Sequence, residues 1–105
     1  MKHGEIWWAE LGSPAGGHPV LLLSRNEAYA VRELIIVSKV TSTIRHIPSE
    51  VPLRVEDGLK KECVVNLDVI ITLDKKALTK RLTALSRAKM EEVETAICFV
   101  LGMKS

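Results

Sequence analysis

At residues 18–25 the chain reads His-Pro-Val-Leu-Leu-Leu-Ser-Arg, a His-Pro pair that opens a wholly apolar run. The run is too short for a helix, and it predicts a core strand over Pro19–Ser24. It follows directly on the loop Gly12-Ser13-Pro14-Ala15-Gly16-Gly17. The glycines and the proline of this loop are typical of a mobile flap. The sequence therefore places a histidine between a flap and a buried strand.

Other apolar stretches predict further strands, and a short helical connection through Glu27, Ala28 and Tyr29 precedes the third. Pro52 favours an edge position for the strand that contains it, and its alternating pattern indicates one face toward water. The apolar run after the Asp57-Gly58 turn is either a strand pair or one long bent strand. The predicted strands, besides the first described, are Ile6–Leu11, Glu33–Val40, Glu50–Val55, and 63–66 with 69–73.

Two adjacent tryptophans, Trp7 and Trp8, must point to opposite faces of the first strand. Both can be buried only if a loop or the terminal helix covers the second face. The alternative is that one of them is a surface anchor, at an interface or under a stacked nucleic-acid base.

Ser86 is placed to cap a final helix that ends at Gly102. Its apolar stripe predicts docking on the strands, with a partner-binding stripe as the alternative. Short strands followed by a single helix predict a mainly β fold with α additions, a small β-barrel that forms one domain over residues 1–105. The stripe consists of Met90, Val93, Ile97, Val100 and Leu101.

Fifteen Lys and Arg residues against thirteen Asp and Glu residues give a net charge of only +2. Any nucleic-acid site must therefore be a local basic patch. The basic residues before and at the last helix, from Lys75-Lys76 through Lys80-Arg81 to Arg87 and Lys89, are one candidate, with a solvated face as the other interpretation.

The apolar surroundings of Cys63 and Cys98 indicate buried free thiols. No run is long enough to span a bilayer, and no leader opens the chain, which predicts a cytoplasmic protein that does not bind membranes. His3 and His46 have no second ligand at metal spacing, so we expect no metal site. The best-marked enzyme motifs, such as the P-loop and the nucleophile elbow, are missing from the sequence.

Several segments, taken in order, resemble the MazF/PemK family of bacterial toxin endoribonucleases. They are Gly4-Glu5-Ile6-Trp7-Trp8-Ala9-Glu10-Leu11, Pro19-Val20-Leu21-Leu22-Leu23, Val40-Thr41-Ser42, the block 64–74 and the terminal helix. The resemblance implies an SH3-like barrel and a homodimer that cleaves single-stranded RNA, often messenger RNA, without metal or cofactor. It also implies inhibition by a cognate antitoxin, whose acidic segment would cover the RNA groove.

The resemblance also implies a catalytic site. Thr41 matches a family threonine whose hydroxyl can donate to a phosphoryl oxygen, and Ser42 beside it is a candidate RNA contact. His18 stands where the family usually has arginine, so a bidentate cation is exchanged for a group that can shuttle protons near neutral pH. Arg25 or Arg45 could supply the missing fixed charge.

Asn66-Leu67-Asp68 aligns with an Arg-x-Asp element of the PemK branch. Asp68 matches the family aspartate and is a candidate proton acceptor, whereas Asn66 cannot act as an acid and is at most an RNA contact. The other interpretation is that Asp68 forms a turn.

Three functions remain open from the sequence. The first is metal-independent cleavage by attack of the 2′-hydroxyl, which leaves a 2′,3′-cyclic phosphate and a 5′-hydroxyl. The second is a non-enzymatic poison of DNA gyrase on the same scaffold, like the CcdB relatives. The third is a member that has lost turnover with the arginine and only binds RNA or antitoxin.

Overall fold

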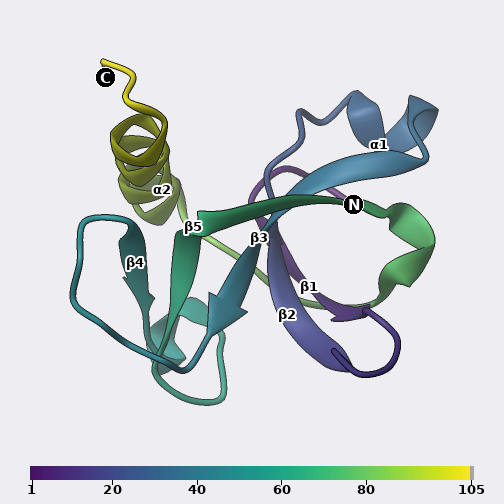
Figure 1. The fold of residues 1–105 in the computed structure, drawn as a ribbon, viewed down its shortest axis with the longest axis horizontal. Coiled ribbons are helices and arrows are strands. Elements are labelled where there is room, and N and C mark those ends of the chain that lie inside the picture. The colour runs from purple at the N-terminus through teal and green to yellow at the C-terminus, as the bar shows by residue number, and fades with distance from the viewer. Residues whose placement is uncertain (105) are drawn as a thin grey trace.

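A computed structural model describes residues 1–104, which form one six-stranded antiparallel sheet, one short α-helix, two 3-10 helices and a long C-terminal helix (Figure 1). The strands lie in the order β4-β5-β3-β2-β1-β6, so β4 and β6 are the edges of a strongly curled sheet. The strands are β1 (Glu5–Glu10), β2 (Gly17–Leu22), β3 (Leu34–Thr41), β4 (Glu50–Leu53), β5 (Cys63–Asp74) and β6 (Leu78–Ala84). The other elements are α1 (Ala28–Val31), η1 (Val55–Asp57), η2 (Lys75–Ala77) and α2 (Arg87–Leu101).

The long strand β5 joins two parts of the sheet because it pairs with both β3 and β4. Its register against β3 shifts between Ser38 and Lys39, which face Ile70 and Asn66. The Ser38 hydroxyl donates to the carbonyl oxygens of Asn66 at 2.7 Å and Val69 at 3.2 Å. These bonds satisfy backbone groups that the irregularity takes out of the ladder. The two predicted segments 63–66 and 69–73 are thus one bent strand.

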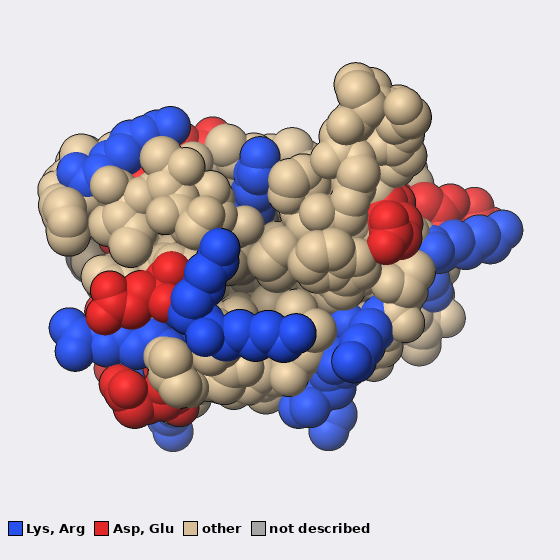
Figure 2. Space-filling model, turned by 90° about the horizontal axis from the view of Figure 1, so that it is seen from below, with Lys and Arg blue, Asp and Glu red and all other residues tan. Residues whose placement is uncertain are grey.

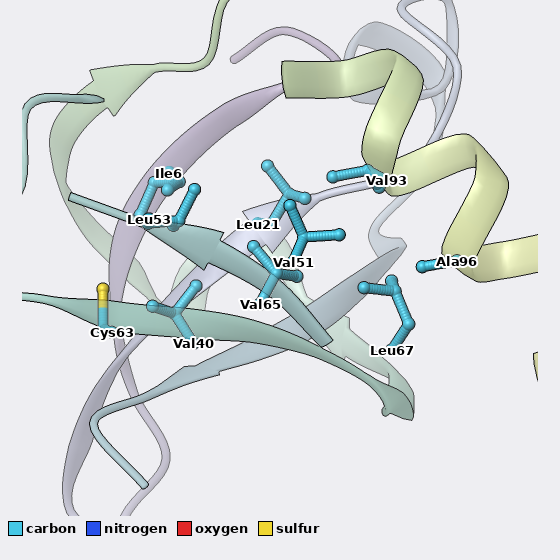
Figure 3. Close-up of a cluster of buried hydrophobic side chains, with 10 residues drawn as sticks. All are labelled: Ile6, Leu21, Val40, Val51, Leu53, Cys63, Val65, Leu67, Val93 and Ala96. Carbon is cyan, nitrogen blue, oxygen red and sulfur yellow. The ribbon is translucent and has the colours of Figure 1, made fainter. Parts of the chain in front are cut away.

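Two clusters of buried apolar side chains fill the two sides of the curled sheet. The larger one joins the β strands to α2, whose Val93 and Ala96 point at Val51 and Leu67 (Figure 3). Ser86 caps α2 by accepting from the backbone N–H of Lys89, and Gly102 ends it in the left-handed conformation. The predicted docking of the helix is therefore confirmed, although Leu101 remains 58% exposed and Ala96 packs in the core instead.

The structure corrects the sequence interpretation of β6 and Glu50. Lys80 and Arg81 were expected to belong to a basic run before the helix, and no strand was predicted there, whereas they lie on an edge strand that pairs with β1. Glu50 was expected to face water but is buried, because the loop before β4 folds over it and the Arg45 backbone N–H donates to its Oε1 at 2.8 Å. The edge position of the strand that contains Pro52 is confirmed.

The structure also bears on the expected buried free thiols and on the expected lack of a membrane-spanning segment. Both cysteines are free, Cys63 buried and Cys98 half-buried. Among residues 1–104 no helix has the length and apolar character needed to cross a bilayer.

Candidate functional site

A cavity of about 630 Å³ opens where the C-terminal end of β3, the start of β2 and the loop between η1 and β5 meet. These segments lie together at the lower side of the molecule in Figure 1. His18 and Pro19 of β2 and Thr41 and Ser42 at the end of β3 are among the lining residues. The fold thus brings together three of the residues singled out in the sequence, His18, Thr41 and Ser42, from segments more than 20 positions apart.

His18 is the second residue of β2 and is half-buried, and its Nε2 lies 2.8 Å from the carbonyl oxygen of Ala15. Because a carbonyl oxygen can only accept, Nε2 carries the hydrogen of this bond. Nδ1 is then the nitrogen that can exchange a proton with a bound substrate. The bond also ties His18 to the preceding loop, in which the Gly16 N–H donates to the carbonyl oxygen of Gly12 at 2.6 Å.

The hydroxyl of Thr41 accepts from the backbone N–H of Thr43 at 3.2 Å. This bond leaves the hydroxyl hydrogen free to be donated, since a threonine oxygen can accept and donate at once. Ser42 follows on the exposed loop. The end of β3 therefore presents two hydroxyl groups to the cavity.

The cavity is strongly basic although the chain is nearly neutral. Among the described residues, the lining contains no Asp or Glu. It holds five Lys and Arg residues: Lys39, Lys60, Lys61, Lys80 and Arg81. Figure 2 views the molecule from this lower side and shows Lys and Arg side chains at several places around a central uncharged area, with Asp and Glu side chains beside them at the left and right. A local patch of this kind is what a site for a polyanion requires.

The sequence interpretation missed most of these cations. Lys39 lies on β3 in an otherwise apolar run, and Lys60-Lys61 follow the Asp57-Gly58 turn; these three lysines were not named as candidates from the sequence. Thr83 of β6 donates from its hydroxyl to the Asp57 carbonyl oxygen at 3.1 Å, which holds the lysine-bearing loop beside the cavity. Of the basic run 75–89, only Lys80 and Arg81 line the cavity.

Four other candidate residues lie outside this lining. Asn66 is buried and its Oδ1 accepts from the Asp68 backbone N–H at 3.0 Å, a local turn within the irregular part of β5. Arg25 lies at a shallow depression beside His3 and Asn26. Arg45 is on the exposed loop that covers Glu50. The structure does not bring these side chains to His18.

A buried carboxylate fixes the strand pair that forms one wall. Glu5 accepts from Arg81 Nε at 2.8 Å, Trp7 Nε1 at 3.0 Å and the Lys2 backbone N–H at 2.9 Å. Burial raises the pKa of this carboxyl, but the hydrogen bonds from Arg81, Trp7 and Lys2 outweigh it, so that the pKa lies below its ordinary value. Glu5 thereby holds β6 against β1.

Two further ionisable groups are perturbed by burial. Burial, with a smaller effect of the Glu5 charge, raises the pKa of Tyr29 to about 12. Burial and then Asp57 raise the pKa of the Cys63 thiol, which lines the cavity. A thiol with a raised pKa is a poor nucleophile, so Cys63 serves as an apolar wall residue.

Within the part of the chain that the structure describes, no three His, Cys, Asp or Glu side chains gather closely enough to hold a metal ion. The cavity offers an imidazole, two hydroxyls and a set of cations as its polar groups.

The family model for the PemK-like, MazF-like toxin of type II toxin-antitoxin systems matches residues 2–101. The chain belongs to this toxin family. A relative from Mycobacterium tuberculosis, the probable endoribonuclease MazF2, is 39% identical over 93 residues, which cover 88% of this chain and 89% of MazF2. The resemblance found in the sequence is confirmed, and the expected enzyme class, endoribonuclease, agrees with the name of this relative.

Solved MazF structures share the fold. A mycobacterial endoribonuclease in complex with its cognate antitoxin has a TM-score of 0.88 at 30% identity and covers 100% of this chain and 98% of its own. The Mycobacterium tuberculosis toxin MazF-mt6 has a TM-score of 0.89 at 25% identity, with 96% and 99% covered. A MazE-MazF structure from Deinococcus radiodurans has a TM-score of 0.85 at 27% identity, with 99% and 98% covered. The predicted mainly β fold with a C-terminal helix is confirmed.

Proposed function

We propose that this MazF-like chain is a toxin that cleaves single-stranded RNA, messenger RNA included, in the cavity beside His18 and Thr41. One observation carries the proposal: the cavity joins an imidazole, two hydroxyls and five cationic residues, with no carboxylate in its lining. Arg81 is paired with the Glu5 carboxylate at 2.8 Å, and the four lysines of the lining are the charges that attract phosphates. The family membership and the names of the relatives support the same reaction class.

The proposed reaction is an attack of the RNA 2′-hydroxyl oxygen on the adjacent phosphorus. A bond from the 2′-oxygen to phosphorus forms and the bond from phosphorus to the 5′-oxygen breaks, which leaves a 2′,3′-cyclic phosphate and a 5′-hydroxyl. The 2′-hydroxyl releases its proton to water, and the leaving 5′-oxygen takes one up. The nucleophile is part of the substrate, so no metal-bound water is needed.

The residues of the cavity have distinct roles in this proposal. The His18 imidazolium donates from Nδ1 to the leaving 5′-oxygen, since its Nε2 is engaged with Ala15. Thr41 donates its hydroxyl hydrogen to a phosphoryl oxygen, where negative charge builds up. The cations that line the cavity take the place of the fixed charge that the family arginine would bring.

The chain's partner in this proposal is a cognate antitoxin whose acidic segment covers the basic cavity, as a structural neighbour is known with its cognate antitoxin.

We also propose a homodimer. Large apolar side chains near the end of α2, Phe99, Leu101 and Met103, are 58–60% exposed, and a second copy would shield them. Light scattering should give twice the mass of one chain; a monomer at all concentrations would contradict the dimer.

The test of the reaction is incubation of the pure protein with mixed single-stranded RNA in a metal chelator. We expect cleavage to a 2′,3′-cyclic phosphate, and none at a position where the 2′-hydroxyl is replaced by hydrogen. Cleavage of the 2′-deoxy substrate would contradict the mechanism. Binding without cleavage at any concentration would contradict enzymatic activity and favour a protein that only binds RNA.

A further inference from the structure

The two adjacent tryptophans of β1 have different surroundings. Trp7 packs against the smaller apolar cluster and donates to the buried Glu5. Trp8 belongs to neither cluster, although it is only half exposed, and it lines the cavity. The large apolar ring of Trp8 thus forms part of the cavity wall and not part of either buried apolar cluster.

The indole of Trp8 is held in place from two directions. Its Nε1 donates to Glu10 Oε1 at 2.8 Å, so the polar group of the ring is satisfied without a ligand. Its Nε1, Cε2 and Cζ2 atoms lie so close to Gly17 that a Cβ at this position would be 2.5–2.6 Å from them. Only glycine at position 17, next to His18, leaves room for the ring.

The surroundings of Trp8 are those of a binding surface for a nucleotide. Pro19 and Lys80 are its partners on the neighbouring strands, and both line the cavity with it. Leu59 and Leu82 add apolar area to the same wall. An aromatic ring beside cations is the combination that holds a single-stranded nucleic acid, because the base stacks on the ring while the phosphate contacts the cation.

We propose that Trp8 is the platform on which one unstacked RNA base rests next to the cleaved phosphate, with Gly17 and Glu10 fixing the ring. This proposal rests on the proposed ribonuclease function and adds a nucleotide subsite to it. A base bound against a preformed ring fixes the register of the RNA relative to His18. Trp8 therefore contributes to binding and to the choice of the cleaved position.

The chain has only two tryptophans, which allows each one to be observed alone. The probe is a short single-stranded RNA whose cleavage is blocked by 2′-deoxy substitution. In Trp7→Phe, which keeps Trp8, RNA should quench the tryptophan fluorescence as it does in the wild type. In Trp8→Phe, which keeps Trp7 and an aromatic ring at position 8, the RNA should still bind but leave the fluorescence unchanged.

Three variants measure the effect of the ring on RNA binding. Trp8→Leu should weaken RNA binding by about tenfold or more, because stacking on the ring is lost. Trp8→Phe should retain most of the wild-type affinity, because it keeps an aromatic ring. Gly17→Ala should weaken binding as well, since it displaces the indole. Circular dichroism should match the wild type in each variant that is compared.

The outcomes separate the subsite from the function. If wild-type protein cleaves RNA but Trp8→Leu binds it equally well, or if Trp7 alone reports the RNA, the subsite is overturned and the function stands. If wild-type protein neither binds nor cleaves RNA, both are overturned. Quenching of Trp8 by an acidic peptide and not by RNA would assign the cavity to a protein partner and would also overturn the proposal.

Discussion

At the scale of single residues, His18 and Thr41 make separable contributions to the proposed reaction. His18→Ala removes the proton donor and should lower the cleavage rate by about 100-fold or more. Thr41→Val keeps the shape but removes the hydroxyl, and should lower it by about 100-fold as well. Single-turnover cleavage with saturating protein measures both effects. Binding of 2′-deoxy RNA should change only a few-fold, and unchanged rates in both variants would contradict the site.

The replacement of the usual family arginine by His18 can be examined directly. His18→Arg restores a fixed bidentate cation but removes the imidazole that is proposed to donate the proton. If His18 is the proton donor, the variant should bind RNA at least as tightly and cleave it more slowly at neutral pH. Cleavage faster than in the wild type would show that the cavity works better with a fixed charge, contrary to the proposed role.

Glu5 makes a different prediction at the same scale, for stability against pH. The pKa of its carboxyl is lower in the folded chain than its ordinary value, so its stabilising effect is complete above the unfolded pKa of about 4.3 and is lost as the pH falls through the folded value. Urea unfolding should show Glu5→Gln less stable than wild type at pH 7, with the difference shrinking below about pH 4. A difference that stays constant down to pH 3 would contradict this.

At the scale of elements, the flap is the loop between β1 and β2, and it contacts the site through His18. The loop is closed by the bond from the Leu11 N–H to the Gly16 carbonyl oxygen at 2.9 Å, and His18 contacts it at Ala15. We expect RNA that occupies the cavity to order this loop. A broad-specificity protease should cleave within residues 12–16 more slowly when 2′-deoxy RNA is bound. An equal rate with and without RNA would contradict the flap.

The elements differ in how well the sequence predicted them. Strands β1, β2 and β3 were predictable because each contains an apolar run with several buried side chains, and Ser86 and Gly102 marked both ends of α2. β6 was missed because it is an edge strand whose Lys80 and Arg81 face solvent, so its composition resembles a helix surface or a loop. The irregular part of β5 also depends on the side chain of Ser38, 28 positions from Asn66.

The same reasons limit what the sequence says of the site. His18 and Thr41 were found through the family resemblance, and their segments are long-range neighbours only after β2 pairs with β3. The cationic residues of the cavity come from three separate segments, so no window of sequence contains the patch. Asp68 and Asn66 align with a family motif, yet the bend of β5 keeps them out of the cavity lining.

At the scale of the whole molecule, charge is distributed very unevenly. The net charge is +2, but the cavity lining holds five cationic residues and no carboxylate. Long-range attraction of RNA is therefore weak, and binding depends on contacts at the cavity. Such contacts release counterions, so the affinity for single-stranded RNA should fall with salt, with a log–log slope of about −0.7 for each phosphate contacted.

This dependence gives a test of where RNA lies on the molecule. In the double variant Lys60→Gln/Lys61→Gln, the magnitude of the slope should decrease by about 1.4 if both lysines contact phosphates. The matched control is Lys76→Gln/Lys104→Gln, which removes the same charge from exposed positions outside the cavity lining. Titrations with 2′-deoxy RNA at several salt concentrations measure both. Equal slopes in the two variants would mean that the salt dependence of RNA affinity follows only the total charge, which would contradict RNA binding at the cavity.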